Sequence, residues 1–211
     1  RFPSFLHTLL LYLTIGDTDH NELICSTVLY GLHAAIQELS IPPDTDPLTV
    51  IPEEDANAIN AIVGELTNFL SVQYINIWSF IYKFLGILPT LLKSATFIFL
   101  QAPIISSMEK MTNPDTKNLD LITNFVAGCA NEIGLLNFFT NVELQPDDTE
   151  NYETLVLPIL DAYSSKKNFD DLSFTINSLM PVEETLLENS EEDDGSKRLW
   201  HRLWNVLPNC V

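Results

Sequence analysis

Apolar residues recur along most of the chain at spacings of three and four positions, which is the period of one face of an α-helix. Alternation over the length of a strand is nearly absent, apart from short pieces such as Phe174-Thr175-Ile176. The pattern therefore predicts an all-α protein. The main predicted stripes are Phe5, Leu6, Leu9, Leu10 and Leu13; Cys25, Val28, Leu29, Leu32, Ala35, Ile36 and Leu39; Ile59, Ile62, Val63, Leu66, Phe69 and Leu70; Leu119, Ile122, Phe125, Val126 and Cys129; Leu155, Ile159, Leu160 and Tyr163; and Leu172, Ile176, Leu179 and Met180.

Prolines predict where several of these helices begin and end. Pro52 is followed by two glutamates, which indicates a helix start, because proline has no N–H to satisfy there and acids favour the positive end of the helix dipole. A later helix should contain Trp78 and stop near Gly86 or Pro89, and the next should end at Pro103, since an interior proline removes a hydrogen bond and clashes with the preceding turn.

The predicted helices are short and lack the heptads of a coiled coil, which leaves a compact bundle or a solenoid of stacked hairpins. Many apolar stripes need burial on both sides, and stacking provides this, so an α-solenoid of HEAT- or armadillo-like helical hairpins is favoured. HEAT repeats run ~40 to 47 residues, so about five hairpins are expected in a single helical-repeat region over residues 1–211. A start at Arg1 without methionine suggests an excerpt of a longer chain.

A strongly acidic stretch near the end of the chain predicts a solvated loop over residues 188–197. The basic, amphipathic segment Lys197–Trp204 follows it. Such a segment can bind a membrane or a partner groove. It can also be the first helix of another helical repeat, with Trp200 and Trp204 in the core and its basic residues facing acidic neighbours. This interpretation is favoured because a tryptophan side chain buries a large apolar area.

The stretch Ile75–Met108 is very apolar, and a membrane helix has to be considered because a span needs ~20 such residues. Two lysines and two prolines interrupt the stretch, and each charge-free piece is shorter than a span. Buried helices are therefore the preferred interpretation, and membrane association remains an alternative.

The chain has 29 acidic and 10 basic residues, for a formal net charge of −19. No lysine or arginine occurs between Arg1 and Lys83. Such a surface repels phosphate backbones and anionic lipid head groups, so nucleic-acid binding by the whole surface is not expected. The acidic residues could bind basic partners, or they could only keep an apolar chain soluble.

No motif predicts catalysis. The histidines and cysteines lack metal-ligand spacing, the glycines form no phosphate-binding loop, and paired carboxylates lie in polar stretches. We therefore expect no enzyme, no catalytic, metal-binding or cofactor-binding residue, and no cofactor, while the partner-binding residues cannot be named. The cysteines are expected to be buried, reduced thiols. The scattered residues are His7, His20, His33, His201, Cys25, Cys129 and Cys210.

An ordered set of short signatures nevertheless resembles one family. The signatures are Ser71-Val72-Gln73-Tyr74 with Trp78 and Leu85-Gly86; Asn118-Leu119-Asp120; Glu132-Ile133-Gly134; Leu155-Val156-Leu157-Pro158-Ile159-Leu160-Asp161; Asn168-Phe169; Leu179-Met180-Pro181-Val182-Glu183; and Leu203-Trp204-Asn205-Val206-Leu207-Pro208-Asn209-Cys210. Together they are similar to the middle region of the ribosomal-RNA-processing protein twelve family. The chain departs from that family at Thr154-Leu155-Val156, where an aromatic residue is usual, and at Pro208-Asn209-Cys210, where Gly-Phe-Cys is usual.

The resemblance implies a non-enzymatic HEAT-repeat scaffold in ribosome biogenesis, acting in small-subunit precursor maturation and nuclear export. It implies a nucleolar and nuclear location with shuttling to the cytoplasm. The implied partners are pre-ribosomal proteins and assembly factors, pre-ribosomal RNA and transport components. Because this segment is acidic, we expect it to bind basic proteins, with the RNA bound through other parts of the parent chain, and to bind no membrane. Trp78, Pro158, Trp204, Pro208 and Cys210 would be packing and turn positions. A karyopherin-like nuclear transport solenoid and a membrane-associated helical protein remain alternatives.

Overall fold

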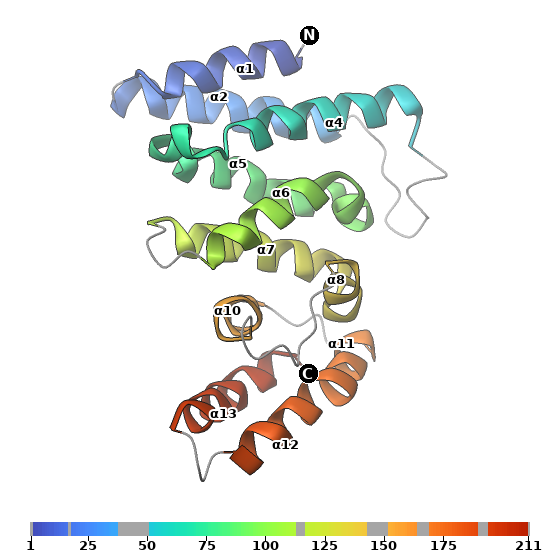
Figure 1. Ribbon diagram of the computed structural model, residues 1–211. Helices are drawn as coiled ribbons and strands as arrows, with labels where there is room; N and C mark the ends of the chain where they lie inside the picture. Colours follow the sequence, from blue (N-terminus) through green and yellow to red (C-terminus); the bar gives the residue numbers. More distant parts are fainter. Residues whose placement is uncertain are drawn as a thin grey trace. The chain divides into compact units, whose positions relative to one another are not determined.

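The computed structural model of the chain describes residues 2–16, 18–37, 51–112, 117–142, 152–163, 169–189 and 194–210 (Figure 1). These ranges contain helices and turns and no β-strand. The predicted all-α fold is thus confirmed. The chain divides into two compact units, Arg1–Ser106 (unit 1) and Ser107–Val211 (unit 2). The expected number of about five hairpins stays a prediction.

Unit 1 is built from helices that pack pairwise. The first two, α1 and α2, form a hairpin; α1 also packs on α4, and α5 packs on both α2 and α4. The elements are α1 (Phe2–Leu13), α2 (Thr18–Gln37), α4 (Glu53–Asn68), the 3₁₀ turn η1 (Val72–Ile77), α5 (Trp78–Leu92), the 3₁₀ turn η2 (Lys93–Ala95) and α6 (Thr96–Met111), which continues beyond the unit boundary.

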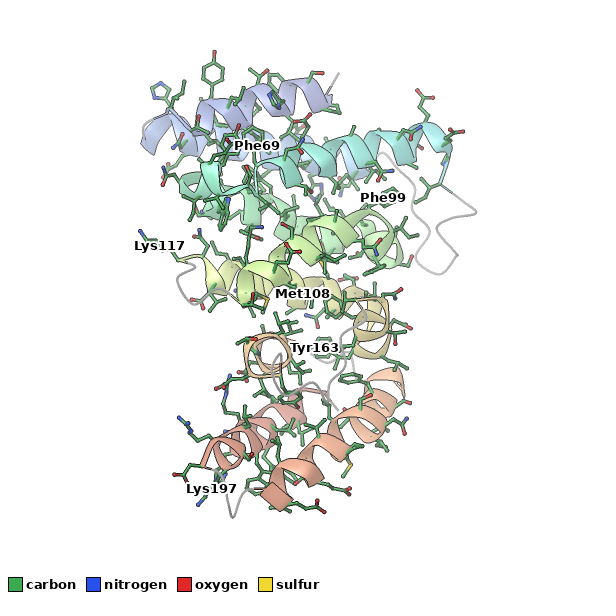
Figure 2. The ribbon with its side chains drawn as sticks, viewed as in Figure 1. Phe69, Phe99, Met108, Lys117, Tyr163 and Lys197 are labelled. Carbon is green, nitrogen blue, oxygen red and sulfur yellow. The ribbon has the colours of Figure 1, made fainter. Side chains whose placement is uncertain are left out.

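The predicted stripes of unit 1 form its core. The whole predicted stripe of α4, with the two residues that follow it, is buried, and Pro52 stands at the start of that helix as expected. In α1, Leu6, Leu10 and Leu13 are buried, whereas Phe5 is 52% exposed. The buried stripe of α2 consists of Val28, Leu32 and Ile36. Figure 2 shows the Phe69 side chain, whose ring contacts His7 and Tyr74 with centroid separations of 5.6 and 4.5 Å.

The predicted helix ends at prolines are wrong. Helix α5 passes through Gly86 and Pro89 to Leu92, and α6 passes through Pro103. An interior proline costs roughly 3 kcal/mol, but α5 buries eight side chains, and each large apolar side chain contributes about 1.5–3 kcal/mol. Burial of the continued helix therefore outweighs the local penalty. The actual break is at Lys93, whose φ of 51° and ψ of −124° end α5.

Among the described residues, the segment Val72–Met111 is long and apolar enough to cross a membrane by length and composition, and half of its most apolar part is buried in the protein. Core helices of soluble proteins satisfy the same test. The segment is also divided by the break at Lys93 into α5 and α6. Its apolar side chains in α5 face α2 and α4, which agrees with the preferred interpretation of buried helices.

Unit 2 is also helical. Its first long helix, α7, packs against α8 and α10; α8 packs against α11; α12 and α13 form a hairpin, and α13 also contacts α10. The elements are α7 (Leu119–Ile133), α8 (Leu135–Asn141), the π-helical turn η3 (Tyr152–Val156), α10 (Leu157–Ala162), α11 (Phe169–Phe174), the π-helical turn η4 (Thr175–Leu179), α12 (Met180–Asn189), α13 (Asp194–Val206) and the 3₁₀ turn η5 (Leu207–Cys210).

A sharp bend separates α7 from α8. Gly134 occupies the bend with φ 81° and ψ 149°, a conformation that residues with a side chain rarely adopt. Its N–H donates to the carbonyl of Ala130 at 2.8 Å, and its own carbonyl accepts from the N–H of Phe138 at 2.9 Å. The helix direction bends by 113° between α7 and α8. This glycine therefore allows one chain segment to turn without leaving the backbone groups at the bend unpaired.

Each of the two π-helical turns, η3 and η4, is followed closely by a proline. Turn η3 ends two residues before Pro158, and η4 ends two residues before Pro181. A proline ring clashes with the carbonyl four residues earlier in a regular α-helix, and a π-helical turn is wider. The wider turns thus let the helical path continue across both prolines.

Most predicted stripes of unit 2 are buried, with one exception. All four residues of the stripe that includes Leu155 and Tyr163 are buried. In the last predicted stripe only Leu179 is buried, while Leu172, Ile176 and Met180 are 38%, 51% and 45% exposed. The prediction that this face belongs to the core is therefore wrong, because these three side chains stay largely in contact with solvent.

Both ends of the acidic loop predicted over residues 188–197 are helical in the structure. Helix α12 continues through Glu188 to Asn189, and α13 begins at Asp194, so residues 194–197 are helical. Residues 190–193 lie outside the described part of the chain. An aspartate in a first helical turn interacts favourably with the helix dipole, which explains why α13 starts within the acidic stretch.

Candidate partner-binding clefts

Residues that could support chemistry remain scattered in the described part of the chain. No group of three or more histidine, cysteine, aspartate or glutamate side chains there could hold a metal ion. Three of the histidines lie in unit 1 and His201 in unit 2. The Nδ1 atom of His7 lies 2.7 Å from Oε2 of Glu65, so this imidazole makes a contact between helices.

The two cysteines whose side chains are described are free thiols with raised pKa values. Burial raises the pKa of Cys129 well above its ordinary value, and the charge of Glu132 raises it further. Burial also raises the pKa of Cys25, while Lys83 acts in the opposite direction. Because the thiolate is the nucleophile, both side chains are in the unreactive form near neutral pH. They pack in the protein, as predicted, with Cys25 only partly buried; the side chain of Cys210 lies outside the described residues.

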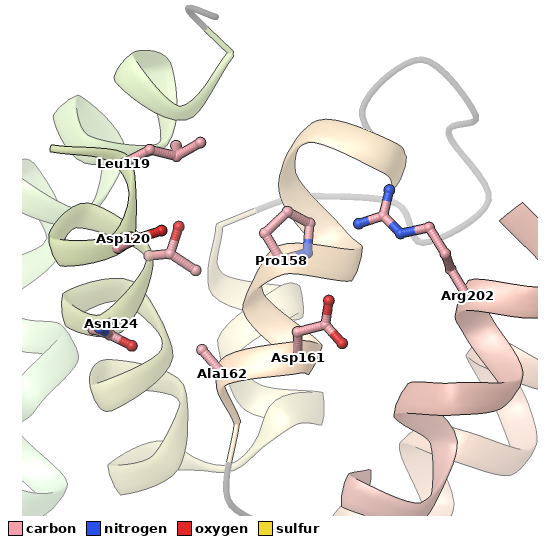
Figure 3. A pocket seen from close by; sticks show the side chains of 8 residues that line it. Leu119, Asp120, Asn124, Pro158, Asp161, Ala162 and Arg202 are labelled. Carbon is pink, nitrogen blue, oxygen red and sulfur yellow. The ribbon is translucent and has the colours of Figure 1, made fainter. Parts of the chain in front are cut away.

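A polar cleft opens in unit 2 between α7, α10 and α13 (Figure 3). Its volume is about 490 Å³. Asp120 and Asn124 line the cleft from α7, Asp161 projects from α10 on the side of Arg202, and Arg202 extends from α13. The cleft also contains Leu119, Thr123, Pro158 and Ala162. We call it the acidic cleft because carboxylates outnumber its single cation.

The cation of the acidic cleft is engaged by a neighbouring glutamate. One guanidinium nitrogen of Arg202 lies 3.3 Å from Oε1 of Glu153, which stands in η3. This contact confirms that a base of α13 faces an acidic neighbour, as the sequence predicted. The carboxylates of Asp120 and Asp161 are exposed and therefore accessible to a ligand. The arrangement can accept hydrogen bonds from a cationic side chain of a partner.

A second cleft, of about 300 Å³, lies where η4 and α12 meet the end of α13 and η5. Its lining is almost entirely apolar and consists of Thr175, Met180, Glu183, Trp204, Leu207 and Pro208. We call it the tryptophan cleft. The Oε1 atom of Glu183 accepts hydrogen bonds from the indole N–H groups of Trp200 at 2.7 Å and Trp204 at 3.1 Å.

The expected burial of both tryptophans is only partly correct. Residues 194–206 do form a helix, and Trp200 is partly buried, but Trp204 is 51% exposed. The buried positions of this helix are Leu203 and Val206 instead. The bond to Glu183 keeps the polar edge of the Trp204 ring at the surface, so one part of the ring packs and the rest faces solvent. The sequence pattern could not reveal this, because Trp204 fits the apolar stripe.

Three other residues singled out by the resemblance, Trp78, Pro158 and Pro208, lie outside the tryptophan contacts of Glu183. Trp78 is buried, and its indole N–H donates to the carbonyl of Ser71 at 3.3 Å. Pro158 stands in the first turn of α10, and Pro208 is exposed in η5. The sequence did not single out Glu183, Met180 or Asp161 as surface residues of a cleft, because these clefts form only where helices meet.

One comparison with known proteins identifies the chain. The family model described as ribosomal RNA-processing protein 12, HEAT repeats, matches residues 19–210. No curated protein and no solved structure matches the chain significantly. The family match covers almost all of the sequence and agrees with the helical hairpins of both units and with the α-solenoid class predicted for them. The chain therefore belongs to the ribosomal RNA-processing protein 12 family, within its HEAT-repeat region.

Proposed function

We propose that this chain is a non-enzymatic scaffold that binds basic proteins during maturation and nuclear export of the small-subunit precursor. The family match over residues 19–210 is the observation that supports a role in ribosome biogenesis. That role implies a nucleolar or nuclear location, and shuttling to the cytoplasm is part of the proposal. Contacts with pre-ribosomal RNA would fall in other parts of the parent protein.

The charge distribution supports basic proteins as partners. The net charge of −19 repels RNA phosphates and attracts cationic segments. Asp120 and Asp161 line an open cleft whose arginine already pairs with Glu153. A lysine or arginine of a partner can therefore enter the acidic cleft and meet two carboxylates.

The decisive experiment is to purify the tagged full-length parent from its own cells, sequence the RNA and identify the proteins that accompany it. Enrichment of small-subunit precursor RNA together with nucleolar assembly factors is expected. Transport cargo or membrane proteins without that RNA would contradict the proposal and leave only the fold and family.

A pair of charge variants tests the acidic cleft in the same purification. We expect D120N/D161N to lose basic proteins, because it removes two carboxylates without changing side-chain size. The variant E53Q/E54Q is the matched control, since it removes two exposed carboxylates from the first turn of α4 in unit 1. Equal losses from both variants would show that general charge, and not this cleft, binds the partners.

A further inference from the structure

Three apolar side chains form an exposed row along one continuous helical run in unit 2. Leu172, Ile176 and Met180 are spaced four residues apart through α11, η4 and the start of α12. They are 38%, 51% and 45% exposed. Side chains four residues apart lie on the same side of a helix, so the row is a contiguous apolar surface. Scattered exposed leucines are ordinary, but a row beside a cleft indicates a binding surface.

The row ends at the tryptophan cleft, because Met180 belongs to both. On the other wall of this cleft Trp204 is 51% exposed, and its indole N–H is bonded to Glu183. The same carboxylate oxygen holds Trp200, so the position of Glu183 is defined by two hydrogen bonds. The Trp204 ring is therefore held in place before any partner arrives. A pre-organised aromatic side chain beside an apolar cleft loses little conformational entropy on binding, which is typical of binding hot spots.

The helical run that carries this row is acidic. From residue 169 to residue 189 the sequence contains Asp170, Asp171, Glu183, Glu184 and Glu188 and no lysine, arginine or histidine. The nearest cations in the sequence are Lys166 and Lys167, which precede α11 and lie outside the described residues, followed by the cations of α13. In α13, Arg202 contacts Glu153, and the exposed Lys197 and Arg198 lie seven and six residues before Trp204. A ligand at the Met180 end of the row would therefore meet the carboxylates of Glu183 and Glu184.

We propose that the row Leu172, Ile176 and Met180, together with the tryptophan cleft, is a docking surface for a basic, amphipathic segment of a partner protein. A large aliphatic side chain of that segment fills the cleft between Met180 and Trp204. Lysine or arginine side chains next to it pair with Glu183 or Glu184. This inference specifies one surface for the basic partners of the proposed function and rests on that proposal.

The experiment uses phage-displayed random 12-residue peptides, selected on the immobilised full chain, followed by fluorescence anisotropy with the enriched peptides. We expect enriched peptides to combine large aliphatic residues with lysine or arginine. Binding should weaken at least tenfold in M180E and in W204A. The matched control is I105E, which places the same charge on a side chain of similar exposure, 44%, in unit 1. Binding of I105E should stay within twofold, and circular dichroism should show that each variant remains helical.

Several outcomes would overturn the inference. They are a selection that enriches no peptide, enriched peptides without cations, equal binding by M180E and I105E, and self-association of the chain that is lost in M180E, which would make a second copy the occupant. A variant that unfolds is replaced by I176E, which tests the same row by the same anisotropy. These outcomes are independent of the parent's RNA: small-subunit precursor RNA that still accompanies an M180E parent would preserve the scaffold role and reject only this surface.

Discussion

The imidazole Nδ1 of His7 lies 2.7 Å from the carboxylate Oε2 of Glu65, so a polar contact joins α1 to α4 across 58 residues of sequence. The side chain of His7 is 48% exposed and that of Glu65 is 26% exposed. Water and salt therefore screen much of the attraction. The His7 ring also meets Phe69 edge-on, which adds packing to the polar contact.

We expect a small coupling between these two residues. A double-mutant cycle with H7A and E65A, followed by urea unfolding, should give a coupling energy of about 0.5–1 kcal/mol, as for other exposed ion pairs. The coupling should fall in high salt, whereas the packing of His7 on Phe69 should not. A coupling that is unchanged in about 1 M salt, where the Debye length is ~3 Å, would show that the contact is not ionic.

The break between α5 and α6 depends on an unfavourable backbone conformation. Lys93 adopts φ 51°, which glycine tolerates much better than residues with a side chain. We expect K93G to raise the free energy of unfolding by about 1 kcal/mol. The control K83G changes an exposed lysine inside α5 and should lower it by about 1 kcal/mol. Destabilisation by both variants in urea unfolding would contradict the prediction.

The buried thiol of Cys129 should make stability depend on alkaline pH. Its pKa is raised in the folded protein by burial and by Glu132, so it stays protonated where an unfolded cysteine ionises. The contribution of this thiol to the free energy of unfolding is fully present below the unfolded pKa of about 8.5. Above that pH it is lost, by up to about 1.4 kcal/mol per pH unit. Urea unfolding between neutral and alkaline pH, compared with C129A, measures this term. A wild-type curve parallel to that of C129A would contradict it.

The same thiol should also resist modification. In native protein at neutral pH, iodoacetamide should label Cys25 faster than Cys129, because Cys25 is partly exposed and Cys129 is fully buried. Peptide mass mapping distinguishes the two sites. Rapid native labelling of Cys129 would mean that α7 opens locally, and labelling after denaturation serves as the control.

Glu183 should stabilise the hairpin of α12 and α13 through both indole groups. Replacing an acceptor of two hydrogen bonds should lower the free energy of unfolding, and we expect a loss of about 1–2 kcal/mol for E183A, given its partial exposure. The variant E183Q keeps an oxygen acceptor and should lose less. The exposed neighbour in E184A is the control. Tryptophan fluorescence during urea unfolding gives both the stability and the ring environment.

The apolar periodicity of the sequence was sufficient to predict an all-α protein and most of its core. Helix α4 shows this, since every residue of its predicted stripe is buried. The ordered signatures also led to the family that the comparison identifies. Both rest on local properties: side chains repeat at the helical period, and short motifs keep their order along the chain.

Only the tertiary structure decided where the helices end and which apolar faces stay exposed. Pro89 lies inside α5 because burial against α2 and α4 outweighs the local cost of the proline. Met180 and Trp204 fit their apolar stripes as well as the buried residues of those stripes do. Both nevertheless stay exposed and line a cleft. Periodicity shows that a helix has an apolar face, but whether that face is covered depends on helices that are distant in sequence.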